Sequence, residues 1–582
     1  MRISARRRGA GWSAARLGLL GCVALGCGAE PARFPLREPL AADTDLRAFQ
    51  APCRKDEKGE SVCAPAEYVS PIVWDGADNL VFRPLADSLA VRAATEAVNA
   101  NSLDEVADSG WFTNRIGAHP FDIEELRRGA CKPEQLLDPA AAADGSWFID
   151  QGKANGATAG FRVKLTPQGK YMMKSDAPVL ERPSAASVIG AAVYHAVGFY
   201  TSCEQVVYFR PSLLKLEPGL KSSANFEAEK PFDEHALQGI LSGLSRRGDT
   251  VRMQASAWLS GKPLGPFRYE GTRDDDPNDV VPHEERRELR GGRILAAWLD
   301  HFDAREQNTM DTWHAESKAP SAPGRILHYY LDTSDCLGSE WAWDGISRRL
   351  GRSYVFDWGD VTSDFVTLGI RQRPWEQVQH TPGRELFGYF EYEHFVPEDW
   401  KMEYPNAAFS RMTERDAAWM ARILAHFTPE MVTALAELGQ FSDPGNTAFL
   451  ARVLEARLVR ILRRYLTRLS PLAHVRVDGA RLCTVDLARS RQLQPDAAYH
   501  YSARLDGRGE LAVERAAGGS VCVILPHAAL GPQLPDNAAE RYRRVVIQSS
   551  AARGPLVAYF YDLGQRGFRL AGLERPEQAE SN

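Results

Sequence analysis

The sequence lacks the short motifs of the common hydrolases and zinc enzymes. No Gly-x-Ser-x-Gly, His-Glu-x-x-His or paired Cys-x-x-Cys occurs in its 582 residues. Each of these motifs sets a nucleophile or metal ligands at a fixed spacing. Their absence argues against a serine hydrolase of the elbow type, a zinc protease and a zinc-binding module.

An excess of positive charge and repeated long apolar runs are missing too. The formal net charge is -6, so there is no electrostatic reason to expect nucleic-acid binding. With 44% hydrophobic and 25% charged residues, the composition is that of a globular protein rather than a fibrous, disordered or multi-spanning one. The length predicts roughly three to four domains.

The one apolar run near the start has the pattern of a bacterial lipoprotein signal peptide over residues 1–27. Arginines precede a short apolar stretch at 17–25, and small residues then lead to Cys27. Cys22 is the alternative lipidated residue, and secretion after cleavage near 28–30 is the alternative process. We expect a lipid-anchored protein of the cell envelope, periplasmic or at the outer membrane, that meets the membrane only through this anchor.

Cysteine is scarce but informative. Cys53 and Cys63 bracket a charged loop, which predicts a local disulfide, and Cys483 and Cys522 are candidates to pair across a β-domain. Three others are scattered without metal-ligand spacing, and we expect buried thiols there: Cys131, Cys203 and Cys336.

The pattern changes several times along the chain. Residues 28–70 are rich in proline, alanine and charge and are expected to form a tether. Within 71–270, three short apolar runs between polar turns predict an antiparallel meander at about 146–174. A helix over 185–197 and strands at 204–209 and 251–259 follow, in the order of a kinase small lobe.

The remaining residues divide into a helical part and a β part. The pattern is helical over 271–470, and it returns to short strands over 473–577, which predicts a separate all-β sandwich. The fold class expected for the whole chain is α+β.

The segment with the clearest chemistry is His301 to Asn308, followed by Asp332. An apolar helix leads into Asp303, Asn308 comes five residues later, and an apolar strand delivers Asp332. Phosphoryl transfer needs such a set: a carboxylate that accepts the proton of the attacking hydroxyl, and an Asn and an Asp that hold magnesium. Asp335 is an alternative metal ligand to Asp332. His301 either orients the loop or is a histidine satisfied at a helix end.

Lysine and glycine candidates precede this segment. Lys174 ends the third strand of the meander, where a phosphate-binding lysine is expected, although a solvated strand lysine has the same pattern. Gly152, Gly156 and Gly160 are candidates for a loop that covers phosphates, but their spacing matches neither glycine-rich fingerprint. The acidic run 274–279 lacks the order of a calcium loop, which favours a polar turn.

Several segments resemble an uncharacterised family of bacterial secreted proteins with a two-lobed, kinase-like architecture. The resemblance covers about residues 70 to 577 and rests on these stretches: 111–117, 259–267, 283–291, 303–311 and 570–575. More distantly, the Asp303, Asn308 and Asp332 set is similar to the atypical kinases, namely phosphatidylinositol kinases, toxin-type Ser/Thr kinases and spore-coat CotH-type kinases. The resemblance implies that Asp303 is the catalytic base, that Asn308 and Asp332 bind metal, and that Lys174 contacts nucleotide phosphates.

Two positions depart from that pattern. Ser187 stands where the first small-lobe helix of such proteins carries an acidic residue to pair with the lysine, and Glu181 is the nearest substitute. Thr333 and Ser334 follow Asp332 in place of the usual Phe-Gly.

Two functions are therefore expected. The first is a metal-dependent phosphotransferase that uses ATP or another nucleotide with Mg²⁺ or Mn²⁺ to modify a protein or glycan hydroxyl. The second is a catalytically degenerate kinase-like envelope protein that acts as a binding or structural module.

Overall fold

The computed structural model of the chain describes residues 33–37, 45–55, 59, 61–69, 72–90, 95–153, 158–177, 179–222, 229–338, 351–527 and 534–578. It is a mixed helix-and-sheet protein, 30% helical and 25% strand, in agreement with the α+β prediction. The proposed signal peptide with Cys22 and Cys27, and also Gly156, lie outside the described residues. No helix in the described ranges is both long and apolar enough to cross a bilayer.

An antiparallel meander forms the centre of the first sheet, as the sequence predicts. Its strands are β3 (Trp147–Gly152), β4 (Gly160–Leu165) and β5 (Gly169–Lys174). The sheet order is β11-β12-β5-β4-β3-β8, and β7 also pairs with β12. The added strands are β7 (Glu204–Phe209), β8 (Leu214–Leu216), β11 (Arg246–Arg247) and β12 (Thr250–Ala257).

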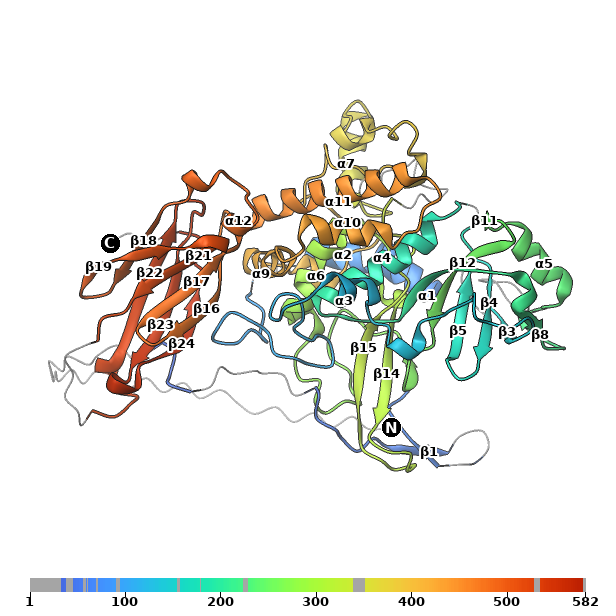
Figure 1. Cartoon of the computed structure of the whole chain (residues 1–582), viewed down its shortest axis with the longest axis horizontal. Coiled ribbons are helices and arrows are strands. Elements are labelled where there is room, and N and C mark those ends of the chain that lie inside the picture. Colours follow the sequence, from blue (N-terminus) through green and yellow to red (C-terminus); the bar gives the residue numbers. More distant parts are fainter. Residues whose placement is uncertain are drawn as a thin grey trace, which may run out of the picture.

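Two helices cover this sheet, which lies on the right of Figure 1. Helix α5 (Glu234–Ser242) contributes Leu237 and Leu241 to a core with the sheet residues Phe161 and Met173. Helix α4 (Arg182–Val197) packs on β7 and β12 and belongs to the core of the helical body. A short ribbon of β9 (Lys221–Ser222) and β10 (Lys230–Pro231) lies beside β3.

A four-stranded sheet joins this region to the helices. Its order is β13-β14-β15-β6, with β6 (Tyr200–Thr201) parallel to β15 (Gly324–Tyr330). Strand β13 (Lys262–Gly265) lies before residue 271. The seven-residue strands β14 (Thr309–Ala315) and β15 lie within 271–470, so the part predicted as helical also contains strands.

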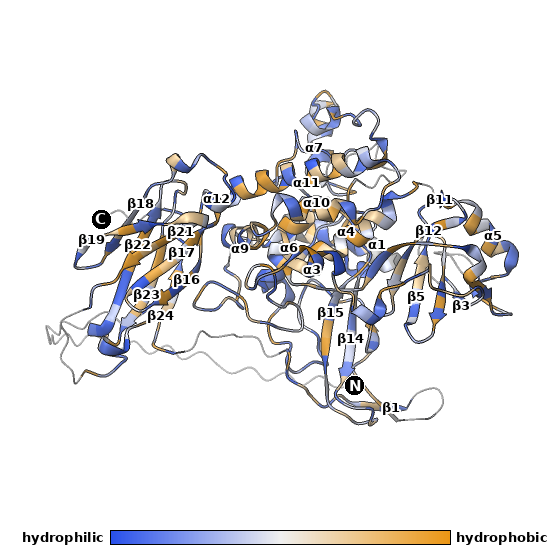
Figure 2. Cartoon of the chain, viewed as in Figure 1, coloured by the Kyte–Doolittle hydropathy of each residue, from blue (hydrophilic) through white to orange (hydrophobic). Residues whose placement is uncertain are grey.

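The helical body surrounds α6 (Arg287–Leu299), nearly all of which is buried. The neighbouring helices begin at N-terminal capping residues. Thr413 forms a capping box with Asp416 at α9 (Glu414–Leu424), and Thr428 caps α10 (Pro429–Glu437). The remaining helices are α1 (Ile72–Ala77), α2 (Arg83–Leu89), α3 (Ile123–Arg128), α7 (Trp358–Thr367), α8 (Ala407–Ser410), α11 (Pro444–Tyr465) and α12 (Leu487–Ser490). Figure 2 shows hydrophobic residues along α10 and α11 and in the helices around α6.

After α11 the chain forms two antiparallel sheets that share one buried core. The first sheet contains β16 (Leu472–Asp478), β17 (Arg481–Asp486), β21 (Ser520–Ile524) and β20 (Val513–Arg515). The second contains β19 (Gly509–Leu511), β18 (Tyr501–Leu505), β22 (Tyr542–Ser549), β23 (Leu556–Asp562) and β24 (Phe568–Glu574). They form the separate group of strands on the left of Figure 1.

Among the described residues there are three disulfides, and two of them are the predicted ones, Cys53–Cys63 and Cys483–Cys522. The expectation of free thiols is right for Cys336, which is buried. It is wrong for Cys131 and Cys203, which form a disulfide across 72 positions of sequence. Spacing along the chain gives no sign of a pair that only folding brings together.

The segment predicted as a tether, 28–70, contains packed structure. Strands β1 (Cys53–Lys55) and β2 (Ser61–Cys63) form a hairpin, and Phe49 bridges to Gly324. Ala51 and Ala64 share a small core with Trp313. Apolar residues within a proline- and charge-rich stretch are sufficient to dock it on the β13–β15 sheet, so the tether prediction is wrong for this part.

A buried cluster holds the first sheet against the helical body. Arg252 of β12, which is fully buried, makes an ion pair with Asp176 (3.1 Å) and donates to the carbonyls of Gly439 (2.7 Å) and Gln440 (2.8 Å). Because a buried guanidinium needs all its donors satisfied, this arginine fixes the sheet relative to the turn between α10 and α11.

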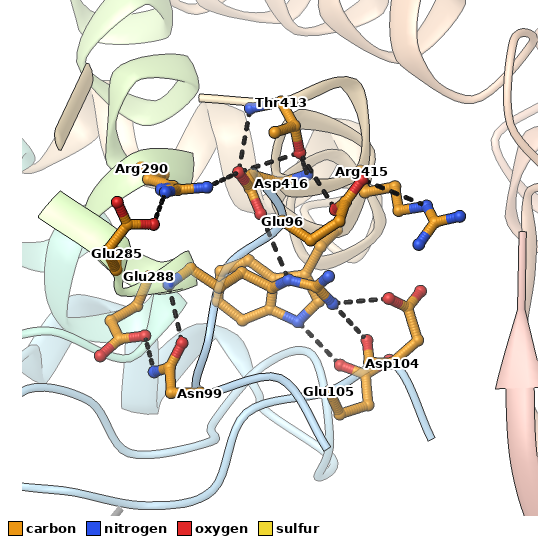
Figure 3. A network of polar contacts seen from close by, with 12 residues as sticks. Glu96, Asn99, Asp104, Glu105, Glu285, Glu288, Arg290, Thr413, Arg415 and Asp416 are labelled. Carbon is orange, nitrogen blue, oxygen red and sulfur yellow. Dashed lines mark hydrogen bonds and ion pairs between the residues drawn. The ribbon is translucent and has the colours of Figure 1, made fainter. Parts of the chain in front are cut away.

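A second network ties the N-terminal segment, the helices and the C-terminal sheets together. Figure 3 shows the part of it that lies around Asp104 and Asp416. Asp104 has ion pairs with Arg287 of α6, Arg422 of α9 and Arg575 beyond β24, at 2.6, 3.1 and 2.5 Å. Burial would raise the pKa of Asp104, but the three guanidinium groups hold it well below its usual range.

Replacement of Asp104 by asparagine should therefore destabilise the protein and change its response to acid. We expect Asp104→Asn to cost about 3 kcal/mol, since it removes the carboxylate that three buried arginines share. The depressed pKa means that this contribution is fully present above the carboxyl's unfolded value near pH 4 and is lost as pH falls from there through the folded-state pKa. Urea unfolding at pH 7 and at pH 2 measures both effects, with the exposed Asp249→Asn as control. Equal losses at both pH values would contradict this assignment.

Candidate functional site

The site is built on the ribbon of β14 and β15, which brings Asn308 beside the segment that carries Asp332. Thr309 pairs with Tyr330, and one step further the Leu331 N–H donates to the Asn308 carbonyl at 2.8 Å. Two residues separated in sequence by a hairpin thus lie at the same end of one ribbon.

Asn308 also holds the loop that precedes it. Its Nδ2 donates to Oδ2 of Asp303 at 2.9 Å and to the Asp303 carbonyl at 2.8 Å. The loop begins where α6 stops at Asp300, and Arg457 donates to the last carbonyls of that helix. The predicted pair Asp303 and Asn308 is therefore a direct contact.

Asp303 is only 2% exposed and has two charged neighbours. Nε of Arg305 lies 2.8 Å from its Oδ1. Burial raises the pKa of Asp303 well above its usual range; Arg305 opposes the shift and Glu403 reinforces it. Sequence reasoning missed Glu403, which comes 100 positions after Asp303 and is placed by a bond from its N–H to the Phe302 carbonyl (2.7 Å). No sequence signal connects the two.

Lys174 of the first sheet forms an ion pair with Asp332, which follows β15 of the four-stranded sheet. Nζ of Lys174, at the end of β5, lies 3.2 Å from Oδ2 of Asp332. Asp332 has a left-handed backbone (φ 46°), and Ser334 donates to its Oδ1 at 2.7 Å. Partial burial alone would raise the pKa of Asp332, but Lys174, Ser334 and Lys153 hold it well below its usual range. Its side chain keeps 38% of its surface exposed.

A second lysine, Lys153, belongs to the same group and was not singled out from the sequence. It follows β3, and its Nζ donates to the Thr158 carbonyl at 2.7 Å. Burial and the charge of Lys174 lower the pKa of Lys153 to about 8, against the opposing charge of Asp332. Lys174 ends β5 and Lys153 directly follows β3, so both lie where a meander strand ends, and this is the sequence feature that the two lysines share.

The candidate glycines have packing roles. A side chain on Gly152 would meet the Lys221 carbonyl and Cβ of Ser222, each at 2.7 Å, and one on Gly160 would meet the Met173 carbonyl at 2.2 Å. Close approach of neighbouring strands explains both glycines, and a role of Gly152 in phosphate binding stays a prediction.

His301 joins this loop to helix α4. It is fully buried, and its Nδ1 lies 2.8 Å from the hydroxyl of Tyr194. Burial lowers the pKa of His301 to about 4, with Asp332 opposing, so the ring is neutral near pH 7. The bond to Tyr194 fixes the ring at the start of the loop, whereas Nε2 of His301 is buried with no hydrogen-bond partner among the residues that the structure describes. The histidine is therefore only half satisfied, and its role in orienting the loop stays a prediction.

The expected acidic partner of Lys174 on α4 is absent. The carbonyl of Ser187 accepts a bond from Thr333 at 3.0 Å. Glu181, the nearest substitute, accepts bonds from the backbone N–H and the hydroxyl of Ser442, in the turn before α11. The carboxylate of Glu181 therefore links the start of α4 to the turn before α11 and does not serve as the partner of Lys174.

A magnesium ion at this site would depend on few protein ligands. In the described part of the chain, no three His, Cys, Asp or Glu side chains are grouped so as to hold a metal. Magnesium bound with a nucleotide commonly takes one or two carboxylates and completes its shell with phosphate oxygens and water. The oxygens of Asn308 and Asp332 suit that role.

No family model, curated protein or solved structure matches the chain. The assignment of the site therefore depends on the chemistry and geometry of these residues.

The environment of Lys153 leads to a direct measurement. Labelling of lysines by a short pulse of acetic anhydride, followed by mass spectrometry across pH, should give half-maximal reaction of Lys153 near pH 8. A free lysine side chain titrates at about 10.4. Exposed Lys164 serves as the internal reference, and Asp332→Asn should lower the labelling midpoint of Lys153 further. A midpoint near that of a free lysine would contradict the geometry.

Proposed function

We propose that the chain is an extracytoplasmic lipoprotein with an atypical kinase-like fold that transfers a phosphoryl or nucleotidyl group from a nucleotide to a hydroxyl of a protein or glycan. The observation that carries the proposal is the 3.2 Å ion pair between Lys174 and Asp332, next to the bonded pair of Asp303 and Asn308. The bond from the Leu331 N–H to the Asn308 carbonyl links the two pairs, because Leu331 directly precedes Asp332.

The arrangement supports a two-lobed kinase-like fold as well. Three antiparallel strands, the helix α4 and the further strands of the same sheet, β7 and β12 among them, precede the site, and a helix, a polar loop and a strand hairpin form it. We assign the two C-terminal sheets to a β-sandwich module on the strength of their shared core.

Each residue has a part in the proposed transfer. With a nucleoside triphosphate, Lys174 and Lys153 would contact phosphate oxygens. Asn308 and Asp332 would hold a divalent cation, which would neutralise negative charge on the phosphates. The acceptor oxygen would form a bond to the γ-phosphorus while the bond from that phosphorus to the bridging β–γ oxygen breaks. The proton of the hydroxyl would pass to Asp303, and the nucleoside diphosphate would leave.

The second candidate, a catalytically degenerate binding module, is favoured by two observations. Ser187 replaces the acidic residue expected on α4, and Asp303 is buried against Asn308 and Arg305. An acceptor hydroxyl reaches Asp303 only if the loop or residues 401–404 shift.

Nucleotide and metal binding separates the two candidates. We expect protein lacking residues 1–27 to gain about 2.7 kcal/mol of stability from Mg²⁺-ATP or Mn²⁺-ATP at 100 times Kd, measured by thermal shift. Asp332→Ala should lose this gain, and Asp335→Ala, the matched control, should keep most of it. Asp303→Ala should still bind nucleotide but lower transfer about 10²- to 10⁴-fold. Absence of any nucleotide-dependent shift in the parent would favour the binding module.

The lipid anchor is tested separately. We expect Cys27→Ser to abolish incorporation of an alkyne-labelled fatty acid during expression in a bacterial host, and Cys22→Ser to retain it. The opposite result would assign the anchor to Cys22. Labelling of neither the parent nor the variants would indicate secretion without an anchor.

A further inference from the structure

Lys174 has to be held in place by something other than helix α4. In the proposed reaction, Asp332 binds the metal, so the anion that now pairs with Lys174 would share its charge with a divalent cation. A second anion is needed to keep the ammonium group directed at phosphate, since Ser187 carries no charge and Glu181 is bonded to Ser442.

The register of the first sheet places a carboxylate on the required face. Lys174 pairs with Gln254, while Met172 pairs with Ser256, and Ser256 pairs with Glu204. Directly opposed residues and residues two apart share one face of a sheet. Lys174 and Glu204 therefore lie on the same face, which is the face covered by α4. The alternating residues, including Met173 and Ala255, point into the other core.

Glu204 is fixed by three donors on this face. The hydroxyls of Ser202 and Ser256 donate to its Oε1 at 2.6 and 2.5 Å, and Nε2 of Gln254 donates to its Oε2 at 2.8 Å. Three donors on a carboxylate stabilise its charged form. Gln254 lies between the two charged residues, because it pairs with Lys174 and donates to Glu204.

The electrostatics agree with this geometry. Burial alone would lower the pKa of Lys174, and the charges of Asp332, Glu204 and Asp335 raise it overall. Burial raises the pKa of Glu204, while Lys174 and the three donors oppose that shift. Lys153 also lies near Asp332, and the positive charges of Lys153 and Lys174 repel each other.

We propose that Glu204, on strand β7, positions Lys174 for the phosphates of a metal-bound nucleotide, in the place of an acidic residue on the helix. This inference rests on the proposed function. Glu204 is a positioning residue: it acts through the lysine and does not touch the reacting atoms. A strand that is hydrogen-bonded into the sheet holds such a carboxylate in fixed register with the lysine, whereas a helix can move it.

The test uses the full chain and Glu204→Gln, which keeps the shape and removes the charge. We expect the pH of half-maximal labelling of Lys174, measured without nucleotide, to fall in this variant. We also expect the Kd for Mg²⁺-ATP to rise about tenfold. Glu204→Asp, which retains the charge, should keep the labelling midpoint close to that of the parent. Asp150→Asn removes a carboxylate from the same sheet that pairs with Arg162, and it should change neither quantity.

Two further comparisons make the outcome decisive. The double variant Lys174→Met with Glu204→Gln should bind nucleotide no more weakly than Lys174→Met alone, because the glutamate acts through the lysine. An unchanged midpoint for Lys174 in folded Glu204→Gln would overturn the role of Glu204. Failure of the parent to bind nucleotide would instead contradict the proposed function, and the labelling result would still show whether Glu204 holds the lysine. If Glu204→Gln does not fold, Ser256→Ala, which removes one donor, takes its place with the same readouts.

Discussion

The contact between Lys174 and Asp332 is the interaction on which this account depends. One residue ends a strand of the first sheet, and the other follows the β14–β15 ribbon of the helical body. An ion pair at 3.2 Å holds only if both parts keep their relative positions. The fully buried Arg252 provides that constraint, because its bonds reach from β12 to the turn between α10 and α11. His301, bonded to Tyr194 of α4, supplies a second link close to the site.

The two carboxyl groups near that contact differ in their pKa values. Asp332 is held as an anion by lysines and a hydroxyl, whereas Asp303 is buried, and its pKa is raised. Under the proposed function, Asp332 would bind the metal and Asp303 would take up the proton. Asp303 is 2% exposed, so an acceptor hydroxyl would reach it only after its surroundings shift.

Sequence reasoning identified what local pattern and spacing determine. Apolar runs between polar turns predicted β3, β4 and β5, and Glu204 to Phe209 was predicted as a strand with the bounds that β7 has. Asp303, Asn308, Asp332 and Lys174 were found because each stands at the end of a strand or in a loop after an apolar helix.

The features that the sequence did not yield are contacts between distant segments. The Cys131–Cys203 disulfide, the approach of Glu403 to Asp303 and the row from Lys174 to Glu204 all require the register of paired strands or the docking of a loop. The packing of residues 45–69 on the β13–β15 sheet depends on a few apolar side chains within a polar stretch. Local composition does not indicate which distant residues such side chains will contact.

The most direct test of the central claim is a crystal structure of the protein with Mn²⁺ and a non-hydrolysable ATP analogue, with anomalous data collected at the manganese edge. The account predicts an anomalous peak coordinated by Asn308 and Asp332, with phosphate oxygens in hydrogen-bonding distance of Lys174. A nucleotide bound elsewhere, or a manganese ion that leaves the Lys174–Asp332 pair unchanged, would contradict it.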